Sequence, residues 1–321
     1  MGNMKKIFIL FGSFLLVAGT SFCLFRINSA KDSTEEKIFL ELSVEVDENR
    51  SYESQSKVIQ ETVNVLEKRL ESYGVETFEI NKNDFNKLTI CLPQQKSIES
   101  VKNILCTKGK LEFWPTFTCR EVIKELVEID RLYNNELSSL LTLSDYYNTF
   151  ACIGFAHQAD TAKVNAFLSR PEVKEKLPKE LTPMWSAYPL EDNDDCFELI
   201  AIRKSSDYAT VDNNDIESAK AELSDNWNTV SLTMTKKGSK EWEVLTEENI
   251  GRQIAIVLDG QVYSYPNVNE KIKGGVSTIT GKFTSKQAQE LSNILEVGKL
   301  PTSVHIIREW TENKSQIVAK Q

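Results

Sequence analysis

The segment that most constrains the fold of this chain is residues 242–301, because its turns all have local sequence signals. Two short apolar runs, at residues 254–258 and 262–263, are joined by Asp259 and Gly260. An Asp-Gly pair between such runs is typical of a type I′ hairpin, whose two central residues both need positive φ. The sequence therefore predicts an antiparallel hairpin in which Asp259 is a turn residue and not a catalytic acid.

A short strand and a helix are expected after the hairpin. Glycines on both sides of residues 276–279 indicate a strand between two turns. Thr284 and Gln287 have the spacing of a capping box, and Phe283 is placed as the hydrophobic staple of the same helix. Gly298, followed by a proline, is expected to end it.

Three consecutive pieces of this segment resemble the SecD/SecDF family of bacterial export proteins, in its first large domain outside the membrane. The pieces are GRQIAIVLDGQVYSYPNV, IKGGVSTITGKFT and AQELSNILEVGKLP. The form is most similar to the fused SecDF proteins of Bacteroidetes-type bacteria. We interpret the family-motif residues as structural, because backbone geometry accounts for the glycines and for the turn. They are Trp242, Arg252, Asp259, Gly260, Pro266, Gly274, Gly275, Gly281, Phe283, Gly298 and Pro301.

The N-terminus has the features of a membrane anchor. Lys5 and Lys6 precede an uncharged stretch, residues 7–25, which is just long enough to span a bilayer as an apolar helix. Positive charge on the starting side places the rest of the chain outside the cytoplasm. Asn28 stands where signal cleavage after Ala30 would need a small residue. We therefore favour an uncleaved anchor in the inner (plasma) membrane, with the bulk of the chain on the periplasmic side, over a cleaved signal peptide.

The resemblance implies that the family continues beyond the position of Ile307 into membrane helices that carry a proton-coupled motor. This sequence has no second apolar stretch of spanning length after residues 7–25. We therefore expect any coupling to a proton gradient to depend on another protein.

Composition narrows the class of partner and the redox chemistry. The net charge is −9 and there is no basic stripe, which argues against binding to nucleic acid. Five cysteines lie outside the anchor and none forms a C-x-x-C motif, so no complete disulfide framework is indicated. Bridges between Cys119 and Cys152 or between Cys152 and Cys196 stay open.

The order of periodic segments predicts an α+β fold, with a ferredoxin-like βαββαβ base and a mixed α+β head. The predicted base elements are strand 38–47, helix 55–73, strands 77–80 and 87–92, a helix capped by Ser97, and strand 111–114. In the head, we expect mainly helix over 119–186, then strand 197–202, helix 213–223, a strand with Val230, Leu232 and Met234 on one face, and helix 241–249. The predicted domains are a signal-anchor helix (1–33), the base (34–118), the head (119–280), a closing helix and strand (281–311) and a disordered tail (312–321).

No arrangement of residues in the sequence indicates a catalytic or metal-binding site. His157 and His305 are far apart and lack ligand partners at metal spacing. The acidic run at residues 191–195 lacks the glycine and the terminal Glu of a calcium loop, so a solvated loop is favoured. We therefore expect no catalytic residue, no metal site, no cofactor and no enzyme activity.

The resemblance implies a role in Sec-dependent protein translocation. The expected partners are the Sec translocon or full-length SecDF components, unfolded secretory polypeptides, and the inner membrane through the N-terminal helix. The domain would bind emerging polypeptide or modulate a SecDF complex. The alternative is an envelope scaffold or interaction module that is no longer linked to export.

Overall fold

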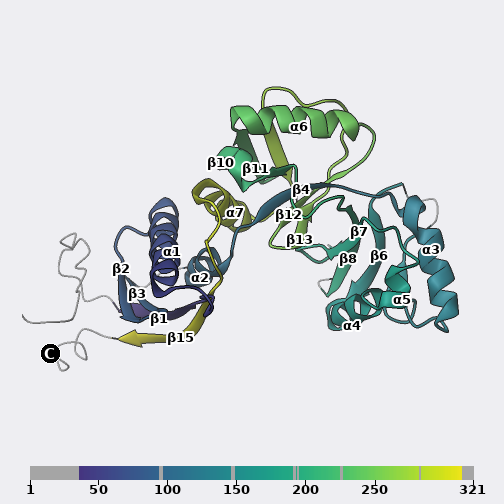
Figure 1. Ribbon diagram of the computed structural model, residues 1–321. Coiled ribbons are helices and arrows are strands. Elements are labelled where there is room, and N and C mark those ends of the chain that lie inside the picture. Colours follow the sequence, from purple (N-terminus) through teal and green to yellow (C-terminus); the bar gives the residue numbers. More distant parts are fainter. Residues whose placement is uncertain are drawn as a thin grey trace, which may run out of the picture. The chain divides into compact units, whose positions relative to one another are not determined.

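The computed structural model describes residues 36–93, 97–145, 149–190, 193, 195–224, 227–281 and 283–312. The predicted anchor helix, the predicted tail after Glu312 and most of the acidic run 191–195 lie outside these residues. No helix in the described ranges is long and apolar enough to cross a membrane. The described residues belong to one compact unit, residues 34–321. Its elements form an α+β fold with several antiparallel sheets, as the sequence predicts (Figure 1).

The base is a four-stranded antiparallel sheet with the strand order β15-β1-β3-β2. Helices α1 and α2 pack against each other and contribute to the same apolar core as this sheet (Figure 1). The strands are β1 (Lys37–Val44), β2 (Glu79–Asp84), β3 (Lys87–Pro93) and β15 (Val304–Glu312), and the helices are α1 (Tyr52–Ser72) and α2 (Ile98–Cys106). The ferredoxin-like prediction is confirmed in its element order.

The prediction was wrong about which segment supplies the fourth strand of the base. Residues 111–114 form part of β4 (Leu111–Pro115), which pairs with β12 and β9 and not with any strand of the base. Strand β15 fills the fourth position instead. The physical reason is side-chain packing. Leu111 and Phe113 are buried in a core that includes Trp242 and is separate from the core of the base. That core is built by segments far away in the sequence, so local periodicity could not reveal it.

Strand β4 lies inside a second sheet, which has the order β13-β12-β4-β9. The other members are β9 (Val211–Asp212), β12 (Ile254–Leu258) and β13 (Gln261–Ser264). Asp259 and Gly260 join β12 to β13 with φ values of 51° and 82°, as a type I′ turn requires. The predicted hairpin is therefore confirmed.

A third sheet, with the order β5-β6-β8-β7, occupies much of the region that the sequence predicts as mainly helical. Its strands are β5 (Thr142–Leu143), β6 (Cys152–His157), β7 (Leu181–Trp185) and β8 (Cys196–Arg203); the helices of this region are α3 (Cys119–Leu132), α4 (Gln158–Leu168) and α5 (Pro171–Lys174). The helical prediction for residues 119–186 was wrong for β6 and β7. Both strands pair with β8, which the sequence does predict as a strand.

The fourth sheet has the order β10-β11-β14 and carries the site described below. Its strands are β10 (Ile216–Glu222), β11 (Thr229–Met234) and β14 (Val276–Thr280). Helices α6 (Lys236–Glu248) and α7 (Ser285–Val297) share its apolar core. The capping box of Thr284 and Gln287 is present at the start of α7. The helix predicted over residues 213–223 was wrong, because a single 3₁₀ turn (Asn213–Asp215) precedes β10 and the rest pairs with β11.

Candidate functional site

Strand β14 is an edge strand, and its outer side shows no covering element among the described residues. Its sequence, VSTIT, contains no charged residue and no proline, and its pairing with β11 has no bulge. Ile279 points into the core, whereas Val276, Thr278 and Thr280 are exposed. A regular, uncharged edge of this kind can pair with another extended chain.

The hydrogen-bonding pattern shows which backbone groups of β14 point outward. In an antiparallel pair, every second residue exchanges both of its backbone bonds with the neighbouring strand. The N–H of Met234 donates to the carbonyl of Gly275 at 2.7 Å, which fixes this alternation along β14. The N–H and C=O groups of Val276, Thr278 and Thr280 therefore point away from β11.

The opposite edge of the same sheet, strand β10, is covered, so the two edges of this sheet differ. The N–H of Ala219 in β10 points away from β11 and donates to the carboxylate of Glu296 in α7 at 2.6 Å. This bond also confirms the alternation, because Ala219 faces Leu232, whose backbone groups must then point towards β14. Helix α7 thus protects β10, and no equivalent contact protects β14 within the described ranges.

Other edge strands in the described ranges carry features that discourage pairing. Strand β13 is bulged and is bridged by Ser186, and β7 contains Pro183. Strands β2 and β15 combine charged residues with a bulge, and β5 and β9 contain two residues each. The regular edge of β14 is therefore the strongest candidate for binding an extended chain.

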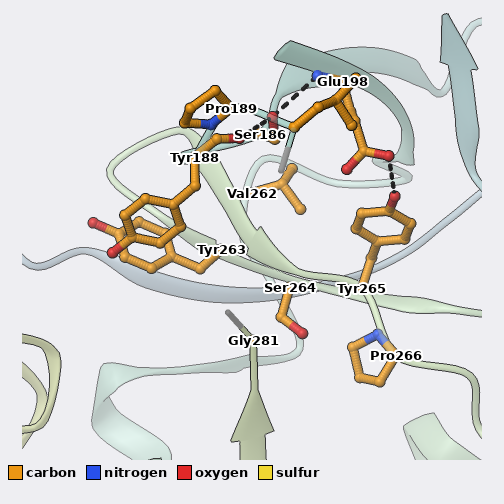
Figure 2. A pocket seen from close by; sticks show the side chains of 11 residues that line it. Ser186, Tyr188, Pro189, Glu198, Val262, Tyr263, Ser264, Tyr265, Pro266 and Gly281 are labelled. Carbon is orange, nitrogen blue, oxygen red and sulfur yellow. Dashed lines mark hydrogen bonds between the residues drawn. The ribbon is translucent and has the colours of Figure 1, made fainter. Parts of the chain in front are cut away.

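A pocket rich in tyrosine lies at the end of β14, and we call it the tyrosine pocket. Its volume is about 280 Å³, and Gly281, the residue after β14, forms part of its wall (Figure 2). The pocket is lined by Ser186, Tyr188, Pro189, Leu190, Glu198, Val262, Tyr263, Ser264, Tyr265, Pro266 and Gly281. The edge and the pocket are therefore adjacent along the chain.

Hydrogen bonds fix the wall of the tyrosine pocket between β8 and the chain that follows β7. The Tyr265 hydroxyl donates to Glu198 Oε1 at 2.7 Å, and the Glu198 N–H donates to Ser186 Oγ at 3.0 Å (Figure 2). Ser186 Oγ donates in turn to the carbonyl of Tyr188 at 2.8 Å. The rings of Tyr188 and Tyr263 meet edge to face, with centroids 5.5 Å apart. The aromatic walls are thus held in place before any ligand binds.

The tyrosines of the pocket stay protonated at neutral pH. Burial, together with the charges of Asp259 and Glu290, raises the pKa of Tyr263 to about 12. Burial also raises the pKa of Tyr188 and of Tyr265, and in Tyr265 the nearby Glu198 carboxylate acts in the same direction. The pocket therefore presents neutral phenol rings beside an acidic side chain.

Two of the family-motif residues, Pro266 and Gly281, line the tyrosine pocket. A side chain at Gly281 would place its Cβ 2.7 Å from the Phe283 ring, which explains the glycine. The Phe283 ring in turn lies 6.0 Å from that of Tyr188. These motif residues shape the wall of the pocket as well as the backbone.

The remaining motif residues lie away from the pocket lining and hold elements together. Asp259 Oδ2 and Oδ1 accept hydrogen bonds from the N–H groups of Gly109 and Lys110, at 2.9 and 2.8 Å. Arg252 donates to both carboxylate oxygens of Glu121. Other positions serve packing or turns: Trp242 packs edge to face on Phe113, and Gly260, Gly274, Gly275 and Gly298 have positive φ.

Sequence reasoning missed the residues that contribute most to the pocket. Tyr263 and Tyr265 stand in the YSY run, which begins in the second strand of the predicted hairpin, and this run was the available signal. Tyr188 and Glu198 come from a distant part of the chain, and no local pattern links them to β13. The pocket is therefore a product of tertiary structure.

The histidines and cysteines are dispersed in the structure. His157 and His305 are largely exposed and lie beside Asp195 and Glu45 respectively. No group of three or more His, Cys, Asp or Glu side chains suited to a metal ion occurs in the described part of the chain. Among the described residues, no disulfide joins Cys91, Cys106, Cys119, Cys152 or Cys196, so neither of the two bridges left open by the sequence is present.

Comparisons with known proteins agree with the fold. The family model for the SecDF P1 head subdomain matches residues 197–302, which include all but the first residue of β8, the whole of β14 and most of the pocket lining. Protein translocase subunit SecD of Rhodothermus marinus is 28% identical over 296 residues, covering 81% of this chain and 47% of the relative. The SecD subunit of Syntrophobacter fumaroxidans is 45% identical over 86 residues, covering 27% of this chain and 16% of the relative.

A crystal structure of SecDF in a super-membrane-facing form has the same fold. It matches with a TM-score of 0.53 at 20% identity, over 87% of this chain and 30% of that chain. The chain spans about half the length of its Rhodothermus relative. The P1 head match, the SecD relatives and the shared fold together support a periplasmic domain of the SecD/SecDF type in this chain.

Proposed function

We propose that this domain assists Sec-dependent protein export by holding unfolded polypeptide on the open edge of β14. The single observation that supports this proposal most strongly is the regular, uncharged edge, whose outward backbone groups at Val276, Thr278 and Thr280 have no covering element in the described ranges. An extended chain would supply the missing donors and acceptors as an added strand. The similarity to the SecDF P1 head subdomain and to SecD supports a place for such binding in protein translocation.

Binding of this type would accept many sequences. The hydrogen bonds of an added strand involve the main chain, which every polypeptide offers. The exposed side chains of β14 are uncharged valine and threonine, so they repel no charged side chain of the incoming strand. Weak and sequence-tolerant binding suits a factor that handles secretory proteins in transit, and it requires no catalytic step.

Membrane attachment and partners are further parts of the proposal. The uncharged stretch at residues 7–25 supports attachment to the inner membrane, with β14 on the periplasmic side. In that position the domain would act beside the Sec translocon or together with complete SecDF components. Its contribution would be to retain polypeptide that has already crossed, or to modulate the complex.

A proline at the edge tests the proposal without disturbing the core. Thr278→Pro removes an N–H that points outward, and proline is tolerated at such positions of edge strands. Thr278→Val keeps the N–H and nearly the same volume, so it is the matched control. We expect Thr278→Pro to weaken binding by at least about tenfold. The variant loses one hydrogen bond between neutral groups, and its proline ring clashes sterically with the added strand. Thr278→Val should bind like the wild type.

The measurement is fluorescence anisotropy of a labelled secretory protein kept unfolded by reduction and alkylation. It is titrated with the full-length protein in lipid nanodiscs, after thermal unfolding has shown that each variant is folded. Equal binding by the wild type and both variants would show that the edge is not used. Absence of binding by the wild type would favour the scaffold alternative.

A further inference from the structure

We infer that the tyrosine pocket binds the cationic side chain, lysine or arginine, of a polypeptide held on β14. This inference rests on the proposed function and adds a preference to it. Main-chain pairing alone reads no side chains, so any preference has to come from a neighbouring pocket. Strand β14 leads to Gly281, which lines the tyrosine pocket, so the pocket lies at the end of the proposed binding edge (Figure 2).

The aromatic walls of the pocket are suited to a cation. Figure 2 shows Tyr188 and Tyr263 together on one side of Val262 and Tyr265 on its other side. The faces of phenol rings attract ammonium and guanidinium groups, and pockets with several such rings recognise these groups. Because the tyrosines stay neutral, the rings keep this character across the physiological pH range.

The charges around the pocket have the matching sign. Glu198 is the one charged residue among the described lining residues, and none of them is Lys or Arg. Asp259 and Glu290 also act on Tyr263 from outside the lining. Lys286 lies 3.8 Å from Glu290 and offsets part of its charge, whereas Glu198 belongs to the lining itself. An acidic occupant would be repelled, whereas a cationic one would be attracted.

The carboxylate of Glu198 can also accept a hydrogen bond from a bound cationic side chain. Its Oε1 accepts the Tyr265 hydroxyl, and one accepted bond leaves further acceptor capacity on a carboxylate. A Lys or Arg head group in the pocket could donate to this carboxylate while its aliphatic part contacts the rings and Val262. The pocket thus offers contacts to both parts of such a side chain.

The test compares peptides that differ in one side chain. Three fluorescent, end-blocked heptapeptides share an uncharged strand-forming sequence and carry lysine, norleucine or glutamate at the central position. We expect the lysine peptide to bind the full-length protein about three- to tenfold more tightly than the norleucine peptide, the range for cation–π contact with partial desolvation. The glutamate peptide should bind most weakly.

Variants of the pocket show whether this preference arises there. Glu198→Gln and Tyr263→Leu should each reduce the ratio of lysine-peptide affinity to norleucine-peptide affinity towards one. Because two different positions are changed, a folding defect in one variant leaves the other as a test. Tyr208→Leu is the matched control, because Tyr208 is 81% exposed and does not line the pocket. It should leave the ratio unchanged.

The outcomes separate this inference from the proposed function. If the lysine and norleucine peptides bind equally and Thr278→Pro weakens both, the edge binds polypeptide and the cation preference is wrong. Tighter binding of the norleucine peptide would make the pocket an apolar one and would overturn the inference as well. If neither peptide binds, both the inference and the proposed function fail.

Discussion

Asp259 shows how one residue can meet a local and a distant requirement together. Its φ of 51° suits the hairpin turn, a conformation that Asp tolerates better than most residues. Its carboxylate also accepts the N–H groups of Gly109 and Lys110, and its own N–H donates to the carbonyl of Lys110. The turn is thereby tied to the segment that links α2 to β4.

The first prediction concerns this double role. Asp259→Ala should lower the free energy of unfolding by about 2 to 3 kcal/mol, because it removes two charge-assisted hydrogen bonds and disfavours the positive φ. Asp259→Asn keeps the turn preference and one acceptor, so it should lose less. Urea unfolding of the three proteins measures the difference. Equal losses for Ala and Asn would mean that the carboxylate contacts contribute little.

Glu121 provides a second prediction, through pH. Burial opposes ionisation of this carboxyl, but hydrogen bonds from Arg252 and Thr118 outweigh it and lower its pKa from 4.5 to about 2. Because the folded-state pKa is depressed, the contribution to stability is complete above pH 4.5 and is lost as pH falls towards 2. The Glu121 side chain is 33% exposed, so solvent screening reduces the contribution to about 1 kcal/mol.

The expected result is a smaller acid-induced loss of stability in Glu121→Gln than in the wild type. The free energy of unfolding of the wild type should fall more steeply between pH 5 and pH 3, and above pH 5 the variant should be less stable by about 1 kcal/mol. Identical pH profiles would show that the ion pair with Arg252 contributes nothing.

At the scale of elements, local signals predicted the structure where the determinants are local. The β12–β13 hairpin, β11 and the capped start of α7 are all present, because turn and cap chemistry sits within a few residues. Strand β10 was predicted as helix because its sequence, IESAKAE, favours helix. Its conformation is decided instead by pairing with β11 and by the bond from Ala219 to Glu296.

The candidate site was less predictable than the fold for the same reason. An open edge is a property of the whole sheet, since it depends on which strand finds no neighbour. The tyrosine pocket combines the YSY run with Tyr188 and Glu198, which lie more than sixty residues earlier in the chain. Only the signal for Tyr263 and Tyr265 was available in the sequence.

The third prediction tests the corrected assignment of the base sheet. Val304 is buried in β15 beside β1, so Val304→Asp should lower the free energy of unfolding by about 3 kcal/mol or more through an unpaired buried charge. The neighbouring His305 is largely exposed, and His305→Ala should cost less than about 1 kcal/mol. Thermal or urea unfolding distinguishes the two. A small effect of Val304→Asp would mean that β15 is not part of the base core.

At the scale of the whole molecule, helix α7 contributes side chains to the apolar cores of both the base and the head. Helix α7 contributes Ile294 to the core of the base and Ala288, Leu291 and Leu295 to the core that contains β10, β11 and β14. Arg69 of α1 is buried and donates to the carbonyl of Gly298, just after α7, at 2.8 Å. The sheet that carries the open edge is therefore connected to the base by packing and by a hydrogen bond from the buried Arg69 side chain.

The central claim is that unfolded polypeptide lies along β14, and site-specific photo-crosslinking tests it most directly. Val276 in β14 and Val244 in α6 are matched positions, being 57% and 52% exposed. Benzoylphenylalanine is placed at one or the other in the full-length protein, which is then irradiated with a labelled, unfolded secretory protein. The account predicts efficient crosslinking from position 276 and little from position 244. Equal yields from the two positions, or crosslinking from position 244 alone, would contradict it.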